Sequence, residues 1–190
     1  LPKGIENVLS HADCVFLTDN KFKTLLSDLS ASNLLAMRGC WIERCREMKS
    51  LFCEEEAEDI SKLGKTLEIL GVSDAINLRS ICSGNLQFEV FQNLRCLYLD
   101  CCPNLSTVFS SSQLPENLKV LQIKFCDKLE TVFKQTSAER RLPNLDTLHL
   151  WELPELNGIG CALPSLQTLK VWECPKLQKL EEYIKLAESL

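Results

Sequence analysis

One pattern of apolar and polar positions recurs along the whole chain, and it can be written L-x-x-L-x-L-x-x-C-x-x-L-x-x-V. Its clearest copy occupies Leu94, Leu97, Leu99, Cys102, Leu105 and Val108. Further copies begin at Met37, Leu67, Leu118, Leu145 and Leu166, and a degenerate first copy starts at Ala12 and loses register near Phe22. The second template position falls at residues 15, 40, 70, 97, 121, 148 and 169, which gives steps of 25, 30, 27, 24, 27 and 21 residues. The chain is therefore built from internal repeats.

The local physics of the template predicts the shape of each repeat. The alternation x-L-x-L-x predicts a short strand with one buried face. A single repeat is too small to cover its own apolar face, so neighbouring repeats must stack, and their strands then form a parallel sheet on the concave side. The later L-x-x-L-x-x-V segment returns across the convex side, and we expect it to be irregular or short-helical. The spacing is that of leucine-rich repeats, so the sequence predicts an α/β leucine-rich-repeat solenoid of about seven repeats.

The repeat pattern also predicts the domain organisation. Residues 1–190 are predicted to be a single leucine-rich-repeat domain, and the absence of an initiator Met suggests a fragment of a longer chain. Residues 1–11 are predicted to form an N-terminal cap. Residues 178–188 carry apolar side chains near helical spacing and are a possible C-terminal helical cap. The polar stretches at 54–56, 110–112 and 134–141 are expected in convex loops.

Composition narrows the classes of function. The net charge of −5 argues against nucleic acid as a partner, since phosphates select basic surfaces. No apolar run reaches the roughly 18–20 residues that span a bilayer, so no membrane partner is expected. The eleven cysteines are an odd number and contain no C-x-x-C pair, so a disulfide framework and the commonest zinc motif are both disfavoured. Free thiols indicate a reducing compartment, and we expect a cytoplasmic protein.

Four of these cysteines share one template position, namely Cys45, Cys102, Cys126 and Cys174. A thiol is small and weakly polar, so it can lie beside the buried carbonyl and amide groups of the turn after the strand. We favour this structural interpretation. The alternative is a metal site, because stacked repeats bring these sulfurs near each other, but the turns would hold them in a line and not around one ion.

The outward positions of the strands are the candidate binding surface. The middle outward column contains Phe16, Trp41, Gly71, Tyr98, Gln122, His149 and Lys170. The following column contains Thr18, Glu43, Ser73, Asp100, Lys124, Trp151 and Trp172. All three tryptophans fall in these columns, and large rings on a solvated sheet usually mark an interface, although they could merely cover the sheet. We select six residues as the predicted protein-binding site, namely Trp41, Tyr98, His149, Trp151, Lys170 and Trp172.

Within that site the C-terminal cluster of His149, Trp151, Lys170 and Trp172 is the strongest part. Lys124 extends its positive rim, whereas Asp100 and Glu43 reverse the sign further along the column. This gradient would favour, and could orient, a partner with an acidic end.

A search for chemistry finds no catalytic set. The two histidines, His11 and His149, belong to distant repeats and cannot share a site within one chain. No phosphate-binding loop and no G-x-S-x-G elbow occurs. The acidic stretch 54–59 is interpreted as a solvated loop, with divalent-ion binding as the weaker alternative. We therefore expect a protein that is not an enzyme and that needs no cofactor or metal.

Several short segments within the repeats resemble those of a known protein family. The segments 102–105 (CPNL) and 174–177 (CPKL) follow directly on a strand, as do 126–133 (CDKLETVF) and 45–52 (CREMKSLF). The segments 142–145 (LPNL) and 163–166 (LPSL) open the last two repeats. Over about residues 8–182 the chain resembles the leucine-rich-repeat region of plant coiled-coil nucleotide-binding disease-resistance proteins.

That resemblance implies a part in innate immunity inside the cell. Such a domain would sense pathogen effectors or modified host proteins and would restrain the receptor's nucleotide-binding module. The implied partners are an effector, a guarded host protein or the receptor's own nucleotide-binding module, and a further alternative is a homodimer through an exposed repeat end. No nucleotide binding carries over, because the coiled-coil and nucleotide-binding modules do not occur in this sequence. The alternative functions are substrate recognition in an F-box ubiquitin ligase and, least favoured, an enzyme with a metal site.

Overall fold

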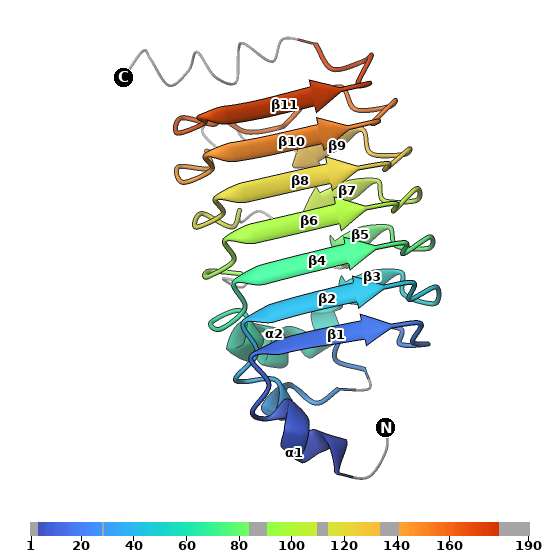
Figure 1. Cartoon of the computed structure of the whole chain (residues 1–190), viewed down its shortest axis with the longest axis vertical. Helices are drawn as coiled ribbons and strands as arrows, with labels where there is room; N and C mark the ends of the chain where they lie inside the picture. The colour runs from blue at the N-terminus through green and yellow to red at the C-terminus, as the bar shows by residue number, and fades with distance from the viewer. Residues whose placement is uncertain (1–3, 28, 84–90, 110–113, 134–140, 179–190) are drawn as a thin grey trace.

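Seven parallel strands form the main sheet of the protein. The computed structural model describes residues 4–27, 29–83, 91–109, 114–133 and 141–178. The sheet consists of β1 (Cys14–Thr18), β2 (Gly39–Glu43), β4 (Ile69–Ser73), β6 (Cys96–Asp100), β8 (Val120–Lys124), β10 (Thr147–Trp151) and β11 (Thr168–Trp172). The strands are stacked in chain order and all run in the same direction (Figure 1). The predicted leucine-rich-repeat solenoid, with its seven concave strands, is confirmed.

The strand register follows the template residue by residue. The second template position forms one continuous column of Cα partners from Val15 in β1 to Leu169 in β11. The third position forms a second such column, from Leu17 to Val171. Both columns point into the interior, so stacking extends one apolar layer along the solenoid.

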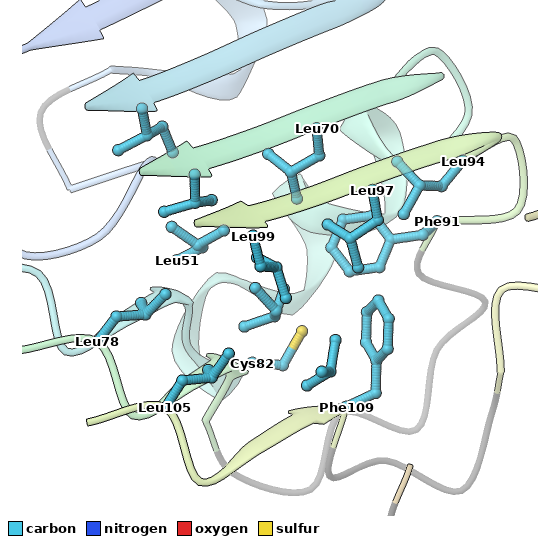
Figure 2. Packing of buried hydrophobic residues seen from close by; sticks show 14 of the residues in the cluster. Leu51, Leu70, Leu78, Cys82, Phe91, Leu94, Leu97, Leu99, Leu105 and Phe109 are labelled. Carbon is cyan, nitrogen blue, oxygen red and sulfur yellow. The ribbon is translucent and has the colours of Figure 1, made fainter. Parts of the chain in front are cut away.

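The core lies between this sheet and the convex segments. Leu70, Leu97 and Leu99 come from the sheet, and Leu78 and Leu105 approach them from the convex side (Figure 2). All five are completely buried. Burying a leucine stabilises a fold by roughly 1.5–3 kcal/mol, so the repeats hold together mainly through this apolar layer.

The convex side is more regular than the sequence led us to expect. Two short parallel sheets form there, β3 (Ser50–Phe52) with β5 (Ser80–Cys82) and β7 (Thr107–Phe109) with β9 (Thr131–Phe133). Each short strand contains the buried last template residue, for example Leu51 or Val132, whose neighbours from adjacent repeats come into register. The expectation of irregular or short-helical chain therefore missed these strands.

The helices are few and short. They are α1 (Ile5–Leu9), η1 (Ala31–Asn33), η2 (Glu54–Glu56) and α2 (Ala57–Leu63). The acidic stretch 54–59, expected to be a loop, is helical, because Glu58 and Asp59 suit the first turn of a helix and Ile60 and Leu63 bury its apolar side.

A column of phenylalanine rings runs through the convex half of the core. Phe52, Phe91, Phe109 and Phe133 have successive ring centroids 5.3, 5.6 and 6.0 Å apart. In the following repeat Gly160 packs directly on the backbone of Phe133. A Cβ atom at Gly160 would lie 1.9 Å from the Phe133 carbonyl oxygen, and its φ is +88°, so only glycine fits there.

The turn after each concave strand explains the shared cysteine position. The Sγ atoms of Cys102, Cys126 and Cys174 donate to the carbonyl two residues earlier, at 3.4, 3.3 and 3.4 Å. Cys45 does the same at 3.7 Å. The residue between carbonyl and cysteine adopts a left-handed conformation in each of these turns, as at Cys101 with φ 49°. The structural interpretation of this cysteine column is confirmed, and none of the eleven cysteines, all of which the structure describes, forms a disulfide.

Asparagine side chains join successive turns. The Nδ2 atoms of Asn77 and Asn104 donate to backbone carbonyls of the preceding repeat, each at 2.7 Å. Asn144 makes an equivalent bond at 2.9 Å at the other edge of the solenoid. These bonds satisfy turn carbonyls that no strand partner reaches.

The two ends of the sheet differ in burial. At the β1 end, α1 lies next to the last strand of the stack and buries Leu9, and a cap formed by residues 1–11 stays a prediction. At the β11 end, Leu169 and Val171 are 37% and 41% exposed, although their counterparts in β10 are fully buried. The possible helical cap at 178–188 lies, except for Gln178, outside the described residues.

Candidate functional site: the concave face of the sheet

The register places all six predicted site residues on one face. Trp41, Tyr98, His149 and Lys170 occupy the middle outward column. Trp151 and Trp172 are direct neighbours in the following column. The structure separates the six into an N-terminal group around Trp41 and Tyr98 and a C-terminal group on β10 and β11.

A third outward column completes this face and was missing from the sequence reading. It consists of Cys14, Gly39, Ile69, Cys96, Val120, Thr147 and Thr168. The strand alternation could have revealed it, because these residues precede the first buried position by one.

Trp41 anchors the N-terminal group. Its ring stacks on Phe16, with centroids 5.1 Å apart and planes inclined by 11°. A Cβ atom at Gly71 would lie 2.6 Å from Trp41 Cδ1, and one at Gly39 would lie 2.8 Å from Cζ3. The two glycines therefore let the indole lie against the sheet, a role that the sequence pattern did not reveal.

A hollow of about 270 Å³ opens beside this ring. Trp41 and Tyr98 wall it, Gly71 lies between them, and Ser73 and Asp100 also line it. Burial raises the pKa of the Tyr98 hydroxyl, with Cys96 adding to the effect, so the hydroxyl is a neutral hydrogen-bonding group at neutral pH. The Oδ1 atom of Asp100 is buried and has no hydrogen-bond partner among the described residues.

The C-terminal group combines aromatic and basic side chains. The Nζ atom of Lys124 lies 5.1 Å from the centroid of the Trp151 ring, a cation–π contact. His149 is half-buried, and burial lowers its pKa, with the positive charges of Lys170 and Lys124 lowering it further. His149 is therefore neutral at pH 7. Trp172 is 59% exposed, the most open of the three tryptophans.

The edge of the C-terminal group is negatively charged, which the sequence analysis did not predict. A groove of about 530 Å³ runs along the turns after β8, β10 and β11. Its lining includes Trp172 together with the carboxylates of Asp127, Glu152 and Glu173. Trp172 thus stands between basic side chains on the sheet and acidic side chains on the rim, because the left-handed position after the strand carries glutamate in both of the last repeats.

A charged network occupies the same rim near β1. Arg44 donates to Asp19 at 2.9 Å and also pairs with Glu43. The hydrogen bond from Arg44 is the main cause that lowers the pKa of Asp19. Because Arg44 also pairs with Glu43, the negative charge of Glu43 is balanced within the chain.

These features suit noncovalent recognition. The face offers exposed rings, separate basic and acidic areas and one aromatic hollow, which are the components of protein interfaces. Within the described ranges, no group of three or more histidine, cysteine or acidic side chains is arranged to hold a metal ion. No helix among those described is long and apolar enough to cross a membrane.

Known protein families now identify the solenoid. Residues 66–190 match the family model described as plant disease resistance protein RPS2-like, leucine-rich repeats. The chain belongs to this family. It is 35% identical over 153 residues to the disease resistance protein At4g19050 of Arabidopsis thaliana, and 31% identical over 104 residues to At5g45510 of the same plant.

The coverage of these relatives is unequal. The first alignment includes 80% of this chain but 12% of the relative, and the second includes 55% of this chain and 8% of the relative. This leucine-rich-repeat domain therefore spans a small part of the disease resistance proteins that it resembles. No solved structure gives a significant match.

Proposed function

We propose that this chain is the protein-recognition domain of a plant innate immune receptor. In this role it senses a pathogen effector or a modified host protein and restrains the receptor's nucleotide-binding module. It works in the cytoplasm, catalyses no reaction and needs no cofactor. Membership of the disease-resistance leucine-rich-repeat family supports the proposal, and the alternative of an F-box ubiquitin ligase has no support among the relatives named above.

The observation that carries the proposal is the exposed aromatic and basic cluster on β10 and β11. Trp172 is 59% exposed although it lies on a regular strand, and its register neighbour is Trp151. Soluble proteins limit such exposed apolar surface unless a partner covers it. Tryptophan is also among the residues that contribute most to binding energy at interfaces.

Both proposed activities can use this one surface. Contact with the nucleotide-binding module would hold the receptor inactive, and an effector or altered host protein would compete for the same contacts. A ligand that binds only the released state shifts the receptor toward activity by its difference in affinity.

The full-length receptor expressed in leaf tissue tests the proposal. We expect Trp172→Ala and Lys170→Glu either to abolish elicited cell death, through lost recognition, or to cause cell death without elicitor, through lost restraint. Matched controls are Ile76→Ala and Lys176→Glu, whose side chains are exposed but lie outside the three outward columns. Unaltered responses from both cluster variants, at equal protein levels, would contradict the proposal.

The exposed apolar end of β11 supports a second, smaller proposal, that two copies associate through this edge. Leu169 and Val171 expose surface there that the preceding repeat buries. Light scattering of the chain tests it, with a dimer that Val171→Lys converts to monomer as the expected result. A monomer at all concentrations would contradict it.

A further inference from the structure

The hollow beside Trp41 has features that the recognition proposal does not use. We propose that it binds a basic side chain, arginine or lysine, of a protein partner. The inference rests on the proposed recognition function and names the chemistry of one contact on its surface. It concerns the N-terminal half of the concave face, away from β10 and β11.

The walls of the hollow are preformed. The indole of Trp41 on β2 lies over Gly71 of β4, and the hollow lies beside this ring and is also lined by Tyr98 of β6. Trp41 is fixed in place by Phe16 on one side and by the backbone of Gly71 below. Aromatic faces that are already ordered bind a flat or compact cation without a further cost in side-chain entropy.

Among the described residues, no basic side chain forms an ion pair with the Asp100 carboxylate in the hollow. Asp100 has Lys124 as its register neighbour on β8, but the Lys124 ammonium lies over the Trp151 ring. Its other neighbour, Ser73 on β4, is uncharged. Among the described residues Asp100 forms no ion pair, whereas Glu43 and Asp19 share Arg44.

The buried Oδ1 atom of Asp100 is a further reason to expect a cation in the hollow. A buried acceptor without a donor costs free energy, and a donor that reaches it recovers this cost. Rotation of the carboxylate is easy because its terminal torsion is broad, so an entering N–H group can meet either oxygen. A charge-assisted hydrogen bond forms in this way with guanidinium or ammonium, whereas an aliphatic or acidic side chain would leave the acceptor unpaired.

The site also fits the charge distribution of the face. Basic Lys170 lies on β11, four strands from Gly71 on β4, which corresponds to roughly 19 Å at the usual strand spacing. A partner with a basic side chain in the hollow and an acidic group near β11 would be held in one orientation.

Nuclear magnetic resonance of the full chain with ¹⁵N-labelled tryptophan tests the hollow directly. The probe is the peptide acetyl-Gly-Arg-Gly-amide, and the control peptide carries citrulline, which has the same shape but no charge. We expect the arginine peptide to shift the Trp41 indole N–H signal with a dissociation constant in the millimolar range and to leave Trp172 unchanged. Asp100→Asn should weaken binding at least tenfold, and the control Asp74→Asn, one step along the rim, should not.

A second variant keeps the test decisive if Asp100→Asn folds poorly. Ser73→Lys places a lysine in register with Asp100 and should block the peptide by supplying the missing cation from within. No shift of Trp41, an equal shift with citrulline, or full binding to both variants would overturn the inference. Failure of the leaf assay on Trp172 and Lys170 would not alter this result, because the peptide measurement involves neither residue.

Discussion

The close packing of Gly160 makes one stability prediction unusually sharp. Gly160 and Gly4 both have a left-handed backbone, with φ of +88° and +90°, but their surroundings differ. An added Cβ atom would meet nothing within 4 Å at Gly4 and would lie 1.9 Å from the Phe133 carbonyl oxygen at Gly160. Gly4→Ala therefore isolates the backbone strain, and Gly160→Ala adds the collision.

The magnitudes follow from these contacts. A left-handed non-glycine residue costs roughly 1–2 kcal/mol, partly offset by the stiffer unfolded chain, so Gly4→Ala should change stability by about 1 kcal/mol or less. At Gly160 the two segments must separate by about 1.5 Å to reach ordinary contact. That separation strains the bonds from Phe133 N to Ile159 O, at 3.0 Å, and from Val132 N to Gly158 O, at 3.2 Å. Losing buried backbone bonds of this kind brings the expected cost of Gly160→Ala to about 3–5 kcal/mol.

Equilibrium unfolding in urea measures both variants. Because repeat proteins can lose an end repeat separately, hydrogen exchange of the β10 and β11 amides should accompany it. We expect Gly160→Ala to lower the unfolding free energy or to remove protection from β10 and β11. A cost no larger than that of Gly4→Ala, with protection intact, would refute the packing argument.

Three further predictions concern the thiols and the histidine of the sheet. Cys126→Ala should cost about 1–2 kcal/mol in urea unfolding, through a small void and a lost polar contact, whereas the exposed Cys14→Ala should cost under about 0.5 kcal/mol; equal costs would contradict the turn role. Burial raises the pKa of Cys40 and Cys82 to about 12. Iodoacetamide at pH 8 should therefore leave both thiols unmodified in the folded protein while the exposed Cys14 reacts. Equal labelling of the three cysteines in mass spectrometry would be inconsistent with this burial. Burial, and after it the charges of Lys170 and Lys124, lower the pKa of His149 below 6.5. The contribution of His149 to the free energy of unfolding is therefore complete above pH 6.5 and is lost as the pH falls through the folded pKa. Lys170→Gln should raise that pKa in a histidine titration, and an unchanged pKa would rule out the charge effect.

Much of the fold was predictable because the repeat imposes the same burial many times over. From Met37 to Ile159 the six-position template matches buried residues in the structure, and the columns of outward side chains follow from strand alternation. Leu51 and Val132 were assigned correctly to the convex core. Their short strands were missed because three residues carry too little alternation to separate a strand from irregular chain.

The candidate site was predictable in its columns but not in its details. Which outward rings share a face depends only on register, and Trp41, Trp151 and Trp172 were placed correctly. The Lys124 ammonium could pair with Asp100 or lie over the Trp151 ring, and only the side-chain conformation, which the sequence pattern does not determine, decides between the two. The hollow lies beside an indole that packs over Gly71, and a glycine in a strand pattern does not say which side chain lies over it.

The central claim is that the exposed cluster on β10 and β11 is an interface and not merely a cover for the sheet. Binding of this chain to the protein that triggers its receptor, measured by calorimetry for wild type and Trp172→Ala, tests it together with the melting temperature. Because the Trp172 side chain is 59% exposed, its removal should shift the melting temperature by less than about 2 °C, while the dissociation constant rises about 30-fold, equivalent to about 2 kcal/mol. An unchanged dissociation constant with a lowered melting temperature would contradict the account, since the ring would then serve the fold alone.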